Sequence, residues 1–151
     1  MESGRFLPLL ALLKTEKIKT DTVIEKESKM TILHYAAFQG RVAAIRAIVE
    51  VFGGDVNLQD VRGATPLAVA VMSKELRAAA TMLNYDDIDV ELFDANGLSP
   101  LLHAARKNHV ALFVYLHFEK GADIYKTCNK GNNVLHLAAE NGSNAIIKLL
   151  Q

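Results

Sequence analysis

The sequence predicts a repeat protein built as a solenoid, because one pattern recurs four times along its 151 residues. Three series of similar residues keep the same 34-residue step. The first series opens a short run of apolar and alanine residues, at Thr31, Thr65, Ser99 and Asn133. The second series consists of Asp55, Asp89 and Asp123, and the third consists of Gly63, Gly97 and Gly131. Three series in one register predict a chain of stacked units, each of which packs mainly against its neighbours.

The repeated unit resembles the ankyrin repeat. The runs at 31–37 (TILHYAA) and 133–139 (NVLHLAA) keep the threonine-like start, the Leu-His pair and the two alanines of the ankyrin signature, and the runs at 65 and 99 keep its proline. The resemblance extends from about Asp21 to the last residue. It implies a β-turn followed by two helices in each unit, so the expected fold class is an all-α solenoid of stacked helix-turn-helix units with β-hairpin loops.

The 34-residue step divides the chain into five segments. We expect an N-terminal capping helix with a degenerate repeat at 1–30, full repeats at 31–64, 65–98 and 99–132, and a truncated fourth repeat at 133–151. In the first full repeat the helices are expected at 31–39 and 42–52. The last helix carries an apolar stripe formed by Ile146, Ile147, Leu149 and Leu150. Terminal repeats normally have a polar outer face, so we expect a fragment of a longer protein whose open end self-associates or frays.

The apolar run at 6–13 has two interpretations. Its length fits the core of a signal peptide, but Glu2 stands in the basic region that a signal requires, and Lys14 and Glu16 follow instead of a cleavage site. The charges favour an amphipathic helix that caps the stack.

Composition argues against several classes of protein. The 17 basic and 17 acidic residues balance, which disfavours a nucleic-acid partner. The single cysteine, Cys128, cannot form an internal disulfide and fits a reducing compartment, so a cytoplasmic location is expected. No apolar run reaches the roughly 18 residues of a membrane span, so membrane insertion by this segment is not expected.

The histidines are the first candidates for chemistry. The resemblance implies that His34 and His136 are structural, with each ring hydrogen-bonded to the backbone of a neighbouring turn. His103 comes one place later in its repeat, where we expect a more exposed side chain. No two histidines have the i, i+4 spacing of a helical zinc site, so metal binding is the weaker alternative. We expect no catalytic residues, no cofactor and no metal.

Two further features leave alternatives open. The acidic run from Asp86 to Asp94 lacks the glycine and glutamate of a calcium loop; it is either a solvated loop or a contact for a basic partner. The resemblance implies that Asn57 stands where some ankyrin repeats are hydroxylated, and the alternative is a turn-stabilising side chain.

The three glycines of the period are expected to have positive φ, because the chain reverses there from an extended arm into a helix. The matching position before the first full repeat holds Lys29, where we expect a different turn.

The function that the sequence favours is a non-catalytic module that binds another protein or a peptide through a rigid concave groove. The candidate contact residues lie at the ends of the first helices and at the hairpin tips: Tyr35, Phe38, Gln39, Arg62, Met72, Ser73, Asn96, His103, Arg106, Lys107, Lys130 and Glu140. Aromatic residues and arginine often anchor such interfaces. The alternatives are a cytoplasmic regulatory or mechanical segment of a larger protein, such as an ion channel, and the substrate-recruiting domain of an enzyme.

Overall fold

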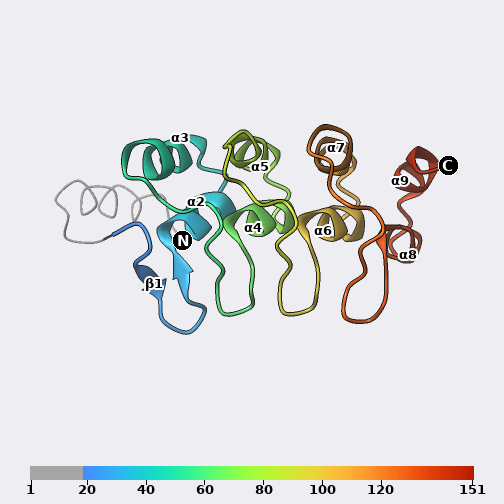
Figure 1. Cartoon of the computed structure of the whole chain (residues 1–151), viewed down its shortest axis with the longest axis horizontal. Coiled ribbons are helices and arrows are strands. Elements are labelled where there is room, and N and C mark those ends of the chain that lie inside the picture. The colour runs from blue at the N-terminus through green and yellow to red at the C-terminus, as the bar shows by residue number, and fades with distance from the viewer. Residues whose placement is uncertain (1–18) are drawn as a thin grey trace.

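Four pairs of helices stand side by side in the computed structural model, which describes residues 19–151 (Figure 1). The first helices of the pairs are α2 (Ile32–Phe38), α4 (Pro66–Met72), α6 (Pro100–Arg106) and α8 (Val134–Glu140). The second helices are α3 (Val42–Arg46) with its π-helical continuation η1 (Ala47–Val51), α5 (Leu76–Leu83), α7 (Val110–Val114) with its continuation η2 (Tyr115–Glu119), and α9 (Asn144–Leu149). The all-α solenoid is therefore confirmed. The capping helix expected near residues 6–14 lies outside the described residues.

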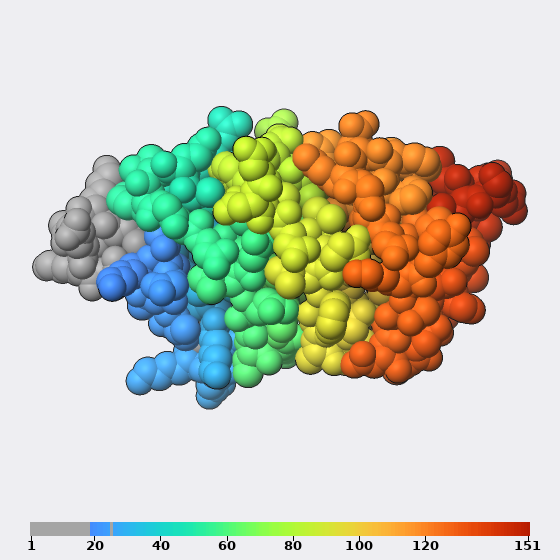
Figure 2. Space-filling view, in the orientation of Figure 1, coloured from blue at the N-terminus to red at the C-terminus, as the bar shows by residue number. Residues whose placement is uncertain are grey.

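The helices and loops form three rows along the long axis. In Figure 1 the second helices lie in the upper row, the first helices lie in the middle row, and the hairpins project below them. We call the first helices the inner helices and the second helices the outer helices. The space-filling view shows the colours following one another in chain order from one end to the other (Figure 2). Each unit therefore packs against its neighbours, as expected for a solenoid.

Four hairpins precede the inner helices. The first (residues 23–31) contains two short strands, β1 (Val23–Glu25) and β2 (Met30–Thr31), which pair antiparallel. The second (55–64), third (89–98) and fourth (123–132) hairpins are irregular loops. Each is closed by a backbone hydrogen bond such as the one from Asp60 N to Ala64 O, at 2.9 Å.

Small side chains allow the inner helices to approach one another. Ala36 and Ala37 of α2, like Ala104 and Ala105 of α6, are completely buried. In the outer helices the buried stripe is larger, for example Ile45 with Ile48, and Phe113 in the third pair. Apolar residues spaced three apart lie on one face of a helix, so this stripe faces the inner row.

Side-chain caps fix where three of the inner helices begin. Thr65 Oγ1 accepts a hydrogen bond from Ala68 N at 3.1 Å, and Ser99 Oγ accepts one from Leu102 N at 3.4 Å. Asn133 Oδ1 accepts a hydrogen bond from His136 N at 3.1 Å. These bonds satisfy backbone donors that the first turn of a helix leaves unpaired.

Positive φ values appear at each hairpin turn. Gly63, Gly97 and Gly131 have φ of 76°, 75° and 80°, which confirms the expected left-handed conformation. The expectation of a different turn at Lys29 is wrong, because Lys29 has the same left-handed conformation with φ of 55°. The backbone of the adjacent hairpin bonds to this turn, from Val61 N to Ser28 O at 2.8 Å. Lys29 therefore adopts a conformation that favours glycine, in a turn that is bonded to the next hairpin.

Candidate interaction surface

Backbone hydrogen bonds tie every neighbouring pair of hairpin tips together. The same bond recurs three times, from Val61 N to Ser28 O at 2.8 Å, from Ala95 N to Arg62 O at 2.8 Å, and from Asn129 N to Asn96 O at 3.0 Å. Asn129 adds a side-chain bond from Nδ2 to Ala95 O at 2.7 Å. The tips are thus held at regular intervals before any partner binds.

The arms of the hairpins are joined by side chains. Asn57 Nδ2 donates to Asp87 O at 2.8 Å, and Asn57 Oδ1 accepts from Asp89 N at 2.9 Å. Both polar atoms of its amide therefore bridge the second hairpin to the segment that leads into the third.

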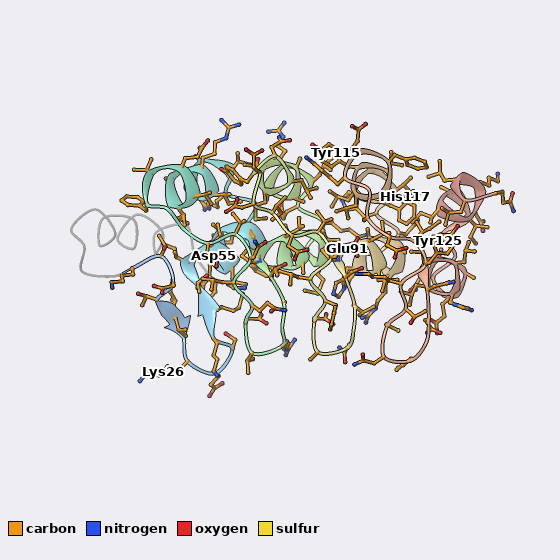
Figure 3. All side chains as sticks on the ribbon, in the orientation of Figure 1. Lys26, Asp55, Glu91, Tyr115, His117 and Tyr125 are labelled. Carbon is orange, nitrogen blue, oxygen red and sulfur yellow. The ribbon has the colours of Figure 1, made fainter. Side chains whose placement is uncertain are left out.

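Glu91 repeats this bridge one unit later. Its Oε1 accepts from Asp123 N at 2.9 Å, and its Oε2 lies 3.0 Å from Lys126 Nζ. Figure 3 shows Asp55, Glu91 and Tyr125, from three successive hairpins, spaced along the array near the level of the inner helices. Part of the acidic run at 86–94 is therefore engaged in the stacking of the repeats.

His34 is structural, as the resemblance implies. The ring is completely buried, and its Nδ1 accepts from Thr31 N at 3.2 Å. Its Nε2 lies 2.9 Å from Ala64 O. A carbonyl oxygen only accepts hydrogen bonds, so Nε2 carries the proton and the neutral tautomer satisfies both contacts. Burial lowers the pKa of His34 below its ordinary value of 6.5, against the opposing effect of the Ala64 carbonyl.

His136 makes the same local contacts at the start of α8. Asn133 N donates to its Nδ1 at 3.0 Å. Its ring is exposed, unlike that of His34, because no further helix pair covers this side of α8 among residues 19–151.

The expected exposure of His103 is wrong. His103 is only 2% exposed, and its Nε2 lies 2.8 Å from Asp94 Oδ2. Burial lowers the pKa of His103, although the hydrogen bond to Asp94 acts in the opposite direction. Its side chain turns toward the third hairpin instead of toward solvent, so it anchors that hairpin to α6.

The other predicted contact residues lie at the hairpin tips and on the inner helices, mostly at their C-terminal ends. The hairpin tips supply Arg62, Asn96 and Lys130, all exposed. The C-terminal ends of the inner helices supply exposed Phe38, Arg106, Lys107 and Glu140, and half-buried Gln39, Met72 and Ser73. Tyr35 is half-buried on α2. We call this set of residues, without His103, the inner surface.

Two exposed aromatic residues lie on the hairpin arms, where the sequence predicted no contact residue. Phe93 is 61% exposed and Tyr125 is 81% exposed. Phe93 occupies the place held by Gln59 in the preceding unit, and its carbonyl accepts from Gln59 Nε2 at 3.2 Å. Comparing units along the 34-residue step would have revealed an aromatic side chain where a neighbouring unit has a polar one.

Four cations of the inner surface are available to a partner. Within residues 19–151, Arg62, Arg106, Lys107 and Lys130 make no ion pair with any carboxylate. In the same part of the chain no group of three or more His, Cys, Asp or Glu side chains could hold a metal ion. None of the helices found there is long and apolar enough to cross a membrane.

Comparison with known proteins agrees with this architecture. The family described as "Ankyrin repeats (3 copies)" matches residues 3–94 and 87–151. The chain therefore belongs to the ankyrin-repeat family, whose repeats are general protein-interaction modules.

The relatives are much longer proteins. The chain is 34% identical over 118 residues to Rabankyrin-5 of Mus musculus and 35% identical to Rabankyrin-5 of Homo sapiens, with 78% of the chain and 10% of each relative covered. It is 30% identical over 118 residues to ankyrin repeat protein nuc-2 of Neurospora crassa, covering 78% of the chain and 11% of that protein. It is also 30% identical over 139 residues to palmitoyltransferase AKR1 of Lachancea kluyveri, covering 89% of the chain and 18% of that protein. The chain thus spans a small part of each of these proteins.

Proposed function

We propose that this chain is a non-catalytic module that binds another protein or a peptide through its inner surface, which acts as a rigid groove. The observation that carries the proposal is the set of backbone hydrogen bonds between neighbouring tips, from Ser28 to Asn129. A surface that is already ordered loses little conformational entropy when a partner binds. Exposed Phe38 and the unpaired arginines, Arg62 and Arg106, supply contacts of the kind that anchor interfaces.

The five segments, 1–30, 31–64, 65–98, 99–132 and 133–151, are proposed as cap, three repeats and a truncated fourth repeat. A reducing, cytoplasmic environment is supported by the single cysteine, Cys128, which is a free thiol.

A second candidate function is a recruiting or regulatory segment within a larger protein. It is favoured by the small share of each relative that the chain covers, and one of these relatives is named as a palmitoyltransferase. In that case the inner surface would hold the substrate or another part of the same protein, and any chemistry would occur outside these residues.

The proposed function can be tested by selecting peptides from a random phage-displayed library on the immobilised chain. Binding of the selected peptides should fall at least tenfold when the inner surface is altered by Phe38→Ala with Met72→Ala. The matched control is Leu76→Ala on α5, because Leu76 is also an exposed apolar residue, at 44%. Selected peptides that bind both variants equally well would exclude the inner surface as the binding site.

A further inference from the structure

The inner surface changes its chemistry in one direction along the array. One place at the end of each inner helix is occupied in turn by Phe38, Met72, Arg106 and Glu140. The order is therefore aromatic, thioether, guanidinium and carboxylate. At the next place Lys107 adds a second exposed cation in the third unit.

We propose that the ligand of the inner surface is an extended peptide that combines an apolar residue with acidic residues. The apolar residue contacts Phe38 and Met72, and the acidic residues contact Arg106 and Lys107. This inference rests on the proposed function and adds the chemistry of the partner.

Although the net charge of the chain is balanced, the carboxylates near the cations of the inner surface are held by other groups. Asp60 Oδ1 accepts from Arg62 N and Ala64 N, both at 2.9 Å. Asp94 is bound to His103, as described above. Glu91 is paired with Lys126. These carboxylates keep their negative charge, but they are not free to pair with the cations. The cations can therefore pair with acidic residues of a partner and accelerate its association.

The spacing of the repeats sets the spacing within the peptide. Packed helices lie about 8–10 Å apart, and an extended chain advances about 3.3 Å per residue. One repeat therefore corresponds to about three residues of ligand. The first acidic residue belongs roughly three to six residues from the apolar one. An acid placed still further along would meet Glu140, which disfavours a long uniform acidic tract.

A nucleic acid is the other polyanion that these cations could attract. The surface favours a peptide, because Phe38 and Met72 offer an apolar contact and Glu140 repels a continuous line of phosphates. Phosphate binding also depends on several basic residues along the backbone of the nucleic acid. Here the exposed cations of the helix row stand at a single repeat.

The inference can be tested with phage-displayed random peptides of about 12 residues, long enough to span about four repeats. Selection on the wild-type chain should enrich peptides that carry an apolar residue and, roughly three to six positions away, acidic residues. Their affinity should fall at least tenfold on the double variant Arg106→Glu with Lys107→Glu. It should also fall several-fold when salt rises from roughly 50 to roughly 200 mM.

Selection on the double variant itself should enrich basic residues at the positions that were acidic. The matched control, Arg77→Glu with Lys148→Glu, reverses the charge of two exposed cations on the outer helices and should leave binding unchanged. Circular dichroism of both double variants checks that the fold is retained.

Three outcomes would overturn the inference. Peptides without charge preference, whose binding still requires Phe38 and Met72, would overturn the ligand chemistry and leave the proposed function standing. Failure to enrich any peptide that depends on the inner surface would overturn both. Tighter binding of a single-stranded oligonucleotide of about 12 nucleotides, lost on the Arg106→Glu and Lys107→Glu variant, would assign the cations to nucleic acid.

Discussion

Nε2 of His103 lies 2.8 Å from Oδ2 of Asp94, and this bond joins inner helix α6 to the hairpin before it. The other oxygen of the same carboxylate, Oδ1, accepts from Asn96 N at 2.9 Å and from Leu98 N at 3.0 Å. A single aspartate thus closes the turn of the third hairpin and fixes its position on the helix.

The fourth hairpin has Cys128 at the place of this aspartate, although its backbone closes in the same way, from Cys128 N to Asn132 O at 2.9 Å. We predict that Cys128→Asp raises the free energy of unfolding by about 0.5–1.5 kcal/mol, because the carboxylate supplies an acceptor for the backbone N–H groups of the turn. Urea unfolding measures the change. Asp60→Cys is the reverse control and should lower stability by a similar amount. A loss of stability in Cys128→Asp would show that the fourth turn cannot accommodate the carboxylate.

Acid should destabilise the protein through His34. The pKa of this buried ring is lowered from 6.5, so the unfolded chain takes up a proton before the folded chain does. The stabilisation is complete above pH 6.5 and is lost as the pH falls from there through the lowered pKa of the folded state. The steepest loss is about 1.4 kcal/mol per pH unit for each such histidine. Urea unfolding at about pH 7.5 and about pH 5.5 measures the slope.

The variant His34→Ala provides the control for this pH dependence. It should be less stable than the wild type at neutral pH, because Ala64 O and Thr31 N lose their partner, and its stability should vary less with pH. An unchanged slope would mean that other groups cause the acid sensitivity.

Two glycines with the same backbone conformation should respond differently to alanine. Both Gly97 and Gly131 have positive φ, so alanine at either position costs about 1–2 kcal/mol in backbone strain. At Gly97 a Cβ would also lie 2.8 Å from the backbone nitrogen of Asn129, whereas a Cβ at Gly131 has no neighbour within 4 Å. We predict that Gly97→Ala is more destabilising than Gly131→Ala by about 1 kcal/mol or more. Equal costs in urea unfolding would show that the fourth hairpin moves aside freely.

The exposed side of α8 should promote self-association of the 151-residue chain. Leu135 is 46% exposed, whereas Leu33, Leu67 and Leu101 at the same place are buried under the next pair of helices. We predict concentration-dependent dimers in sedimentation velocity, weakened by Leu135→Lys because a buried charge opposes the contact. Leu76→Lys on α5 is the control, since Leu76 is similarly exposed and faces another side. A monomer at high concentration, or equal weakening by both changes, would contradict this contact.

The 34-residue step was sufficient to predict the helices and the glycine turns, because each depends on residues within its own unit. The first helix expected at 31–39 is α2 at Ile32–Phe38, and the left-handed glycines lie where the series placed them. The places of the inner-surface residues along the repeats follow from the same series, and their role in binding stays a prediction.

Features that depend on the adjacent unit could not be predicted in this way. His103 packs against the preceding hairpin, where its Nε2 lies 2.8 Å from Asp94 Oδ2, and the turn at Lys29 accepts a bond from Val61 N of the next hairpin. Both partners are set by stacking, which the local pattern of one repeat does not reveal. Exposed Phe93 was not predicted for a different reason: it lies on a hairpin arm, whereas contact residues were expected at helix ends and tips.

The bonds between hairpin tips use backbone atoms of Arg62 and Asn96, and so do not depend on which side chains these positions carry. Arg62, Asn96 and Lys130 can therefore be exchanged during evolution while the stacking of the hairpins is kept. Selection for a new partner and selection for a stable scaffold act on separate atoms of the same residues. The same separation makes these three positions, with the ends of the inner helices, suitable sites for randomisation when a new binding specificity is engineered into this scaffold.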